Sequence, residues 1–163
     1  MGLFDYVFQD TRLRYKDHGF LKTLFRYSRL PSFKLIVIYR LTQYLNRIFV
    51  GGGIILSISR LYIERLNSRY LVLLDDKLEC GPGLSFPHNG PFIINGGAKI
   101  GAYCTIHPNV LIGGDRGDGS PTIGDYYVFI GNGAKIIGKV KVGDWCLNNI
   151  LSDNGRHHVE LYL

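Results

Sequence analysis

The chain has 163 residues, 46% of them hydrophobic, as expected for one globular domain with an appended segment. Its longest apolar run, residues 49–58, contains three glycines and is much shorter than the roughly 20 residues of a membrane-spanning helix. The net charge of +6 is uneven, because residues 1–70 carry 12 Lys and Arg against 4 Asp and Glu, whereas residues 71–163 carry 7 against 9. This pattern argues against an integral membrane protein and predicts a basic N-terminal surface that faces something anionic.

Residues 1–72 are predicted to form an α-helical N-terminal segment. Apolar residues recur at helical spacing over 35–48, where Arg40 falls largely off the apolar stripe, and again over 54–69. Ser32, which follows a proline, is a residue type that caps helices and predicts the start of the first of these helices. We expect the helices to pack on the end of the following domain and to build subunit contacts.

The basic residues of this segment suggest a second role. Mixed with Tyr and Phe, they are suited to rest on an anionic membrane surface. Nucleic acid is a weaker option, because no recognised reading motif is present. No secretory signal is seen at the N-terminus, so we expect a cytoplasmic protein, with the inner face of the membrane as the alternative location. The basic residues are Lys22, Arg26, Arg29, Arg40, Arg47, Arg60 and Arg65.

From Cys80 to Trp145 the sequence repeats itself every six residues. A large aliphatic residue leads each unit, a glycine or another small residue often follows, and a small or β-branched residue comes four places after the leader. This short fixed period predicts a parallel β-helix, in which the leader and the residue four places later point into a narrow core. The main leaders are Ile94, Ile100, Ile106, Ile112, Ile123, Ile130, Ile136 and Val142.

The repeat divides the chain into three parts. Residues 1–72 form the helical segment, residues 73–146 the β-helix domain, and residues 147–163 an atypical tail in which the rhythm stops. The three cysteines, Cys80, Cys104 and Cys146, form no CxxC pair, so no zinc site is expected. They occupy inward-pointing positions of the repeat, which predicts buried free thiols and a reducing compartment.

The first interruption of the six-residue rhythm spans residues 86–92. Breaks in a regular scaffold are where function is usually placed. His88 lies two residues after a leader, so its side chain should point outward, and Asn89 follows it. A lone histidine is often structural, but the outward direction and the flanking proline and glycine favour a functional one.

The second interruption is an inserted polar loop at residues 113–121. It is either a flexible turn or a flap that presents Asp115 and Arg116 to a substrate. Beyond it, the next two leaders are separated by seven residues rather than six. Tyr126 or Tyr127 is therefore an inserted residue and should form a bulge.

Three runs resemble the serine acetyltransferase family, and especially its shorter members from surface-polysaccharide gene clusters. They are GPFIINGGAKIG at residues 90–101, PTIGD at residues 121–125 and IGNGAKIIGKV at residues 130–140. The resemblance covers about residues 20–146. It implies a mainly β fold, a left-handed parallel β-helix preceded by a small α-helical segment.

The resemblance also implies an acetyl-CoA-dependent O-acetyltransferase, without a metal, that works as a homotrimer with active sites between neighbouring β-helices. His88 matches the general-base histidine of the family. Such a base is needed because a hydroxyl is a poor nucleophile until its proton is removed, and an imidazole titrates near neutral pH. The coenzyme would lie along the coil edges near Gly114, Asn132, Gly133, Ala134 and Lys135.

Two departures from the family pattern bear on the substrate. The family pairs its base with an Asp where this chain has Leu73, and Asp75 and Asp76 are the nearby candidates to replace it. Ser120 stands where serine-specific members have a histidine. The departure at Ser120 favours a sugar hydroxyl of a surface-polysaccharide precursor as acceptor. The alternatives are serine O-acetylation in cysteine biosynthesis and a catalytically impaired β-helix scaffold.

Overall fold

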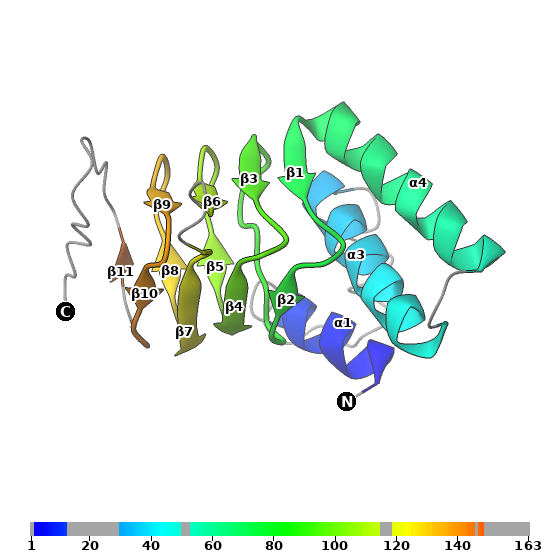
Figure 1. Cartoon of the computed structure of the whole chain (residues 1–163), viewed down its shortest axis with the longest axis horizontal. Coiled ribbons are helices and arrows are strands. Elements are labelled where there is room, and N and C mark those ends of the chain that lie inside the picture. Colours follow the sequence, from blue (N-terminus) through cyan, green and yellow to red (C-terminus); the bar gives the residue numbers. More distant parts are fainter. Residues whose placement is uncertain (1, 13–29, 50–52, 115–118, 146, 149–163) are drawn as a thin grey trace.

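The structure is a computed structural model that describes residues 2–12, 30–49, 53–114, 119–145 and 147–148. Helices gather at one end of the molecule, and a stack of short strands extends away from them (Figure 1). No helix in these ranges is long and apolar enough to cross a membrane. The helices are α1 (Leu3–Arg12), α3 (Pro31–Ile48) and α4 (Ile54–Tyr70).

The strands form three parallel sheets, here named A, B and C. The chain visits the sheets in that order and then returns to A, so each coil is three-sided, with A–B, B–C and C–A corners. Sheet A contains β1 (Val72–Leu74), β3 (Phe92–Ile94), β6 (Leu111–Gly113) and β9 (Lys135–Ile137). Sheet B contains β2 (Glu79–Cys80), β4 (Lys99–Ala102), β7 (Thr122–Tyr126) and β10 (Lys141–Val142). Sheet C contains β5 (Thr105–Ile106), β8 (Phe129–Ile130) and β11 (Leu147–Asn148).

The interior of the coils is filled by the residues that lead the six-residue units. Each of the main leaders is buried, from Ile94 to Val142, and so are Ala98 and Cys104, which lie four places after a leader. The predicted parallel β-helix behind a helical N-terminal segment is therefore confirmed. Cys80 is also a buried free thiol, as predicted, whereas Cys146 lies outside the described residues.

The bulge predicted near Tyr126 is present. Ile100 pairs with Ile123, but Ala102 pairs with Tyr126, so β7 contains one residue more than β4 over the same stretch. The extra residue widens this coil at the B–C corner, where Tyr127 adopts a left-handed backbone conformation with φ of 51°. Bulges of this kind let a strand bend without losing its neighbours.

Aromatic rings stack along the B–C corner. Tyr103, Tyr127 and Trp145 occupy it in successive coils, each with a φ between 51° and 58°. The ring of Tyr127 lies 4.9 Å from that of Tyr103 and 4.6 Å from that of Trp145. In the first coil the corner holds Gly83, where an added Cβ would lie 2.5 Å from the Tyr103 ring. Only glycine fits at Gly83 because the stack ends against its backbone.

Helices α1 and α3 cap the exposed edge of the first coil. The carboxylate of Asp10 accepts hydrogen bonds from the backbone N–H groups of Gly83 (2.7 Å) and Leu84 (2.8 Å). Arg40 donates to Asp10 (2.7 Å) and to the carbonyl oxygen of Cys80 (2.8 Å). Arg40 is only 2% exposed, so its predicted position away from the packed face is wrong. It is buried because the edge of the coil supplies acceptors for its guanidinium.

The start and packing of the longer helices also differ in detail from the prediction. α3 begins at Pro31 with Leu30 as its N-cap, so Ser32 does not cap it. The fixed φ of proline suits the first helical turn, which explains the earlier start. α4 buries one narrow face and leaves a stripe of its apolar side chains exposed. This stripe consists of Ile54, Ile55, Ile58, Leu61 and Tyr62.

Candidate functional site

His88 lies at the C–A corner that ends the first coil, and its side chain is exposed. The corner is built by its neighbours in sequence. Phe86 and Phe92 are both buried and their rings stack at 4.4 Å, so the residues between them loop outward. At Gly90 an added Cβ would lie 2.6 Å from the Cβ of Pro108, so the next coil can approach closely only because this residue is glycine.

A second imidazole accompanies His88. The ring of His107, at the C–A corner of the next coil, lies 5.4 Å from that of His88 and 4.6 Å from the ring of Phe129. Partial burial and the neighbouring His88 lower the pKa of His107 below its usual range. A lowered pKa favours the neutral form of His107 at neutral pH, so this neighbour leaves His88 without an adjacent positive charge.

The structure does not bring Asp75 and Asp76 to His88. Both lie at the A–B corner of the first coil, so the width of sheet A separates them from the C–A corner. Asp75 accepts a hydrogen bond from the backbone N–H of Lys77 (2.9 Å), and Asp76 forms an ion pair with Arg60 (2.8 Å). Within one protomer, neither carboxylate therefore orients His88.

The outer face of sheet A, which begins at the His88 corner, is apolar. Leu73 pairs with Ile93, which in turn pairs with Leu111. Leu73 is 47% and Ile93 46% exposed. Two aliphatic side chains this exposed on neighbouring strands, beside a candidate catalytic residue, are suited to contact another subunit.

Two of the predicted coenzyme-binding residues share the corner of His88. Asn132 and Gly133 occupy the C–A corner two coils further on. Asn109, in the coil between, donates a hydrogen bond from its Nδ2 to Oδ1 of Asn132 (3.0 Å), and the Gly133 N–H donates to the carbonyl of Pro108 (3.1 Å). Asn109 was not singled out from the sequence, although a Pro-Asn pair is a turn signal that could have indicated it.

The other predicted coenzyme-binding residues lie elsewhere. The side chain of Ala134 is fully buried and faces the core. Lys135 is exposed on the outer face of sheet A, where it pairs with Leu111. Gly114 lies exposed after β6 on the way to the A–B corner, where an added Cβ would meet Oγ of Ser120 at 2.9 Å. The predicted coenzyme-binding residues therefore lie along both edges of sheet A and do not form a single cluster.

The predicted substrate-binding residues are only partly described. Asn89 is exposed beside His88, whereas Asp115 and Arg116 lie outside the described residues. Among the described residues, no group of three or more His, Cys, Asp or Glu side chains could hold a metal ion. The described groups available for chemistry along this corner are thus two imidazoles and three asparagine amides.

Comparisons with known proteins point to one family. No protein-family model matches the chain. A serine acetyltransferase of Synechococcus elongatus is 28% identical over 119 residues, which are 70% of this chain and 46% of that protein. The chain therefore spans about half the length of the curated relative that it matches.

Solved structures of serine acetyltransferases share the fold. Isoform 3 of Entamoeba histolytica, solved with cysteine, has a TM-score of 0.69 and 23% identity over 97% of this chain and 61% of its own. A serine acetyltransferase solved in complex with CoA has a TM-score of 0.64 and 25% identity over 88% of this chain and 56% of its own. The chain is thus similar to serine acetyltransferases in sequence and in fold.

Proposed function

We propose that the chain is an acetyl-CoA-dependent O-acetyltransferase whose acceptor is the hydroxyl of serine. The observation that carries this proposal is the position of His88, an exposed imidazole at a coil corner where the repeat is interrupted. The match to a serine acetyltransferase supports the acceptor, and the relative solved with CoA supports the coenzyme as the acetyl donor.

The reaction assigned to this corner is acetyl transfer through a general base. His88 takes the proton of the serine hydroxyl while the oxygen attacks the thioester carbon of acetyl-CoA. The carbon–sulfur bond then breaks, and the protonated His88 returns its proton to the leaving thiolate. Asp75 and Asp76 are engaged at the other edge of sheet A, so neither of these carboxylates assists His88 within its own protomer.

Acetyl transfer is tested by following thiol release from acetyl-CoA in the presence of serine. Replacing His88 with alanine should lower kcat by about 10²- to 10⁴-fold, the usual contribution of a general base. Arg69→Gln, which removes an exposed side chain at the end of α4, is the control and should keep full activity. Equal rates for His88→Ala and wild type would refute the assignment of His88.

A sugar hydroxyl is the second candidate acceptor. It is favoured by Ser120, which stands where serine-specific members have a histidine and which the structure places beside Gly97 at the A–B corner. The same assay with sugar acceptors decides between the two, because the true acceptor stimulates thiol release and the other does not. If neither stimulates release, the remaining alternative, a non-catalytic scaffold, is supported.

Subunit assembly is part of the proposal. The family resemblance implies a homotrimer, and the apolar outer face of sheet A beside His88 is suited to the contact between its subunits. In that arrangement a neighbouring subunit would close the space around His88 and exclude water from it. A cytoplasmic location and a role in cysteine biosynthesis accompany the serine acceptor, whereas a sugar acceptor would place the chain in polysaccharide biosynthesis.

A further inference from the structure

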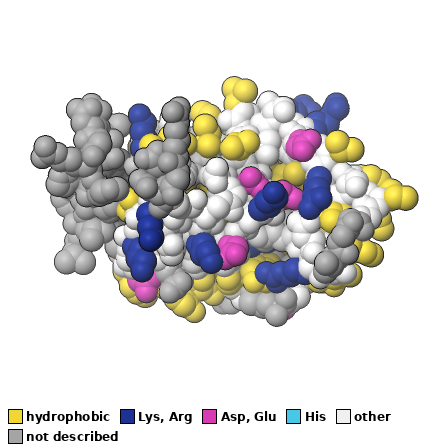
Figure 2. All heavy atoms as spheres, in the orientation of Figure 1, with side chains coloured by type: hydrophobic (Ala, Val, Ile, Leu, Met, Phe, Trp, Pro, Cys, Tyr) yellow, Lys and Arg dark blue, Asp and Glu magenta, His cyan; other side chains and the backbone are white. Residues whose placement is uncertain are grey.

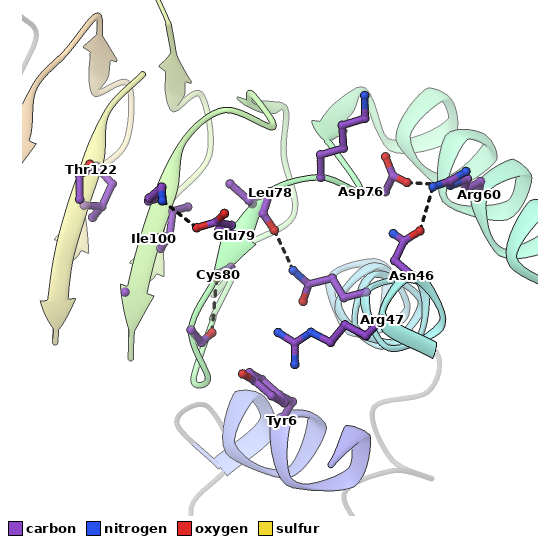
Figure 3. Close-up of a pocket in the computed structure, with 16 residues that line it drawn as sticks. Tyr6, Asn46, Arg47, Arg60, Asp76, Leu78, Glu79, Cys80, Ile100 and Thr122 are labelled. Atoms are coloured by element: carbon purple, nitrogen blue, oxygen red, sulfur yellow. Dashed lines mark hydrogen bonds and ion pairs between the residues drawn. The ribbon is translucent and has the colours of Figure 1, made fainter. Parts of the chain in front are cut away.

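A large groove lies between the helices and the outer face of sheet B. Its volume is about 790 Å³, which is in the range of small-molecule sites. Tyr6 of α1, Arg47 of α3 and Arg60 of α4 line one side, and Glu79 lines the other (Figure 3). Lys99 is also among the lining residues.

The groove is separate from the candidate acyl-transfer site. His88 lies at the C–A corner, and in a three-sided coil sheet B is the side opposite that corner. Of the predicted site residues that the structure describes, only Asp76 lines the groove, and its carboxylate pairs with Arg60. A trimer that assembles through the outer face of sheet A would leave sheet B, and therefore the groove, open to solvent.

The walls of the groove carry more cations than anions. Lys and Arg side chains gather with a few Asp and Glu over the junction of the helices and the first coils (Figure 2). The two acidic groups of the groove are both engaged, because Asp76 pairs with Arg60 at 2.8 Å and Glu79 pairs with Lys99 at 3.1 Å. Two further cations, Arg47 and Lys77, line the groove and have no carboxylate partner among the described residues.

Two of the arginines are held in place by neutral contacts. The guanidinium of Arg47 lies over the ring of Tyr6, with its Cζ 5.8 Å from the ring centre. Arg60 is fixed on its second side by a hydrogen bond to Oδ1 of Asn46 (2.8 Å). Guanidinium groups that are already oriented lose less conformational entropy when they bind a phosphate group, and their planar fork suits its oxygens.

We propose that this groove binds a phosphate-bearing ligand through Arg47 and Lys77, with Arg60 and Lys99 as auxiliary cations. Among the described residues that line the groove, four cations outnumber two carboxylates, and this excess of positive charge suits an anionic phosphate group. The phosphate has two chemical sources, a soluble molecule of nucleotide size or the head group of an anionic lipid. The proposal is independent of acetyl transfer, because no group at the His88 corner takes part in it.

The test uses the 163-residue chain and two probes. Calorimetry with inorganic pyrophosphate measures the soluble source, and sedimentation with phosphatidylglycerol vesicles, against phosphatidylcholine vesicles, measures the lipid source. For whichever probe the wild-type protein binds, the double variant Arg47→Gln/Lys77→Gln should weaken binding at least roughly tenfold, because charge-assisted hydrogen bonds are lost. Both side chains are exposed, so the variant should fold, which circular dichroism verifies.

Arg69→Gln is the matched control, since Arg69 also lies over a tyrosine ring, Tyr70, at 5.9 Å but outside the groove. It should bind like wild type. Pyrophosphate binding that depends on the two residues assigns a soluble ligand, and vesicle binding alone that depends on them assigns a lipid head group. Binding of neither probe, or binding that the double variant leaves unchanged, overturns the proposal. Thiol release measured on the same proteins tests the acetyltransferase separately.

Discussion

At the scale of single residues, the six-residue repeat determines which side chains are buried. Cys80 is a leader and Cys104 comes four places after one, and both are buried. Burial raises the pKa of the Cys80 thiol to about 11 and that of Cys104 well above its usual range. Because only the thiolate is nucleophilic, we expect these two buried cysteines to be structural and unreactive.

This predicts the reactivity of the two thiols. In a Cys146→Ser variant, the remaining cysteines should react with a disulfide reagent at pH 8 only as fast as the protein unfolds. Absorbance after mixing follows the reaction, and urea-unfolded protein, in which both thiols are free, gives the full signal. A fast phase in the native protein would show that one of them is accessible.

The neighbours of outward-facing residues could be predicted less completely than the burial of inward-facing ones. The spacing placed His88 outside the coil because it lies two residues after a leader, and the structure has it exposed. Its neighbour His107 could not be paired with it from spacing, because the slip in register around His88 changes which residues meet across coils. Asp75 and Asp76 are candidates only because they lie near Leu73 in sequence, and the structure separates them from His88 by the width of sheet A.

At the scale of elements, the helices serve the β-helix as an end cap. A solenoid needs a terminal unit that satisfies the hydrogen-bonding groups of its last coil. Asp10, Arg40 and Tyr39 do so here, and the Tyr39 hydroxyl donates to the carbonyl of Leu78 at 2.8 Å. The packing of the helices on the end of the β-helix agrees with the expectation from the sequence. The part played by Arg40 could not be predicted, because a buried arginine contradicts the polarity pattern on which the helix prediction rests.

Removing one partner of the buried pair should destabilise the fold strongly. Arg40→Met leaves the Asp10 carboxylate buried without its cation, which should lower the free energy of unfolding by about 3–5 kcal/mol. Urea denaturation measures the change. Asp10→Asn/Arg40→Met should lose less than the sum of the two single variants, because no uncompensated charge remains.

The exposed Arg69→Met is the comparison for this series. It should change the free energy of unfolding by no more than about 0.5 kcal/mol, as is usual for surface positions. An Arg40→Met protein as stable as Arg69→Met would mean that α1 and α3 do not cap the coil in solution.

At the scale of the whole molecule, two exposed apolar surfaces lie at different places. One is the outer face of sheet A with Leu73 and Ile93, next to His88, and the other is the stripe on α4 that includes Ile58. The sequence indicates that the helices build subunit contacts, but periodicity cannot tell which apolar face stays uncovered in one protomer. Only the first surface adjoins the candidate catalytic residue.

The two surfaces should therefore respond differently to substitution. Ile93→Glu puts a charge into the proposed contact between β-helices, so it should lower the molecular mass measured by light scattering and reduce kcat with it. Ile58→Glu, a matched change at a 60% exposed position, should keep acetyltransferase activity. A fully active Ile93→Glu monomer would refute the subunit arrangement proposed for the site.

The aromatic stack along the B–C corner has a spectroscopic consequence. Trp145 is the one tryptophan of the chain, it is 67% exposed, and its indole rests on Tyr127 at the end of the coils farthest from the helical cap. Its fluorescence therefore senses fraying from the distal end, while far-ultraviolet dichroism is dominated by the helices at the other end. Fluorescence of Trp145 therefore makes it possible to follow unfolding of the β-helix coils separately from unfolding of the N-terminal helices.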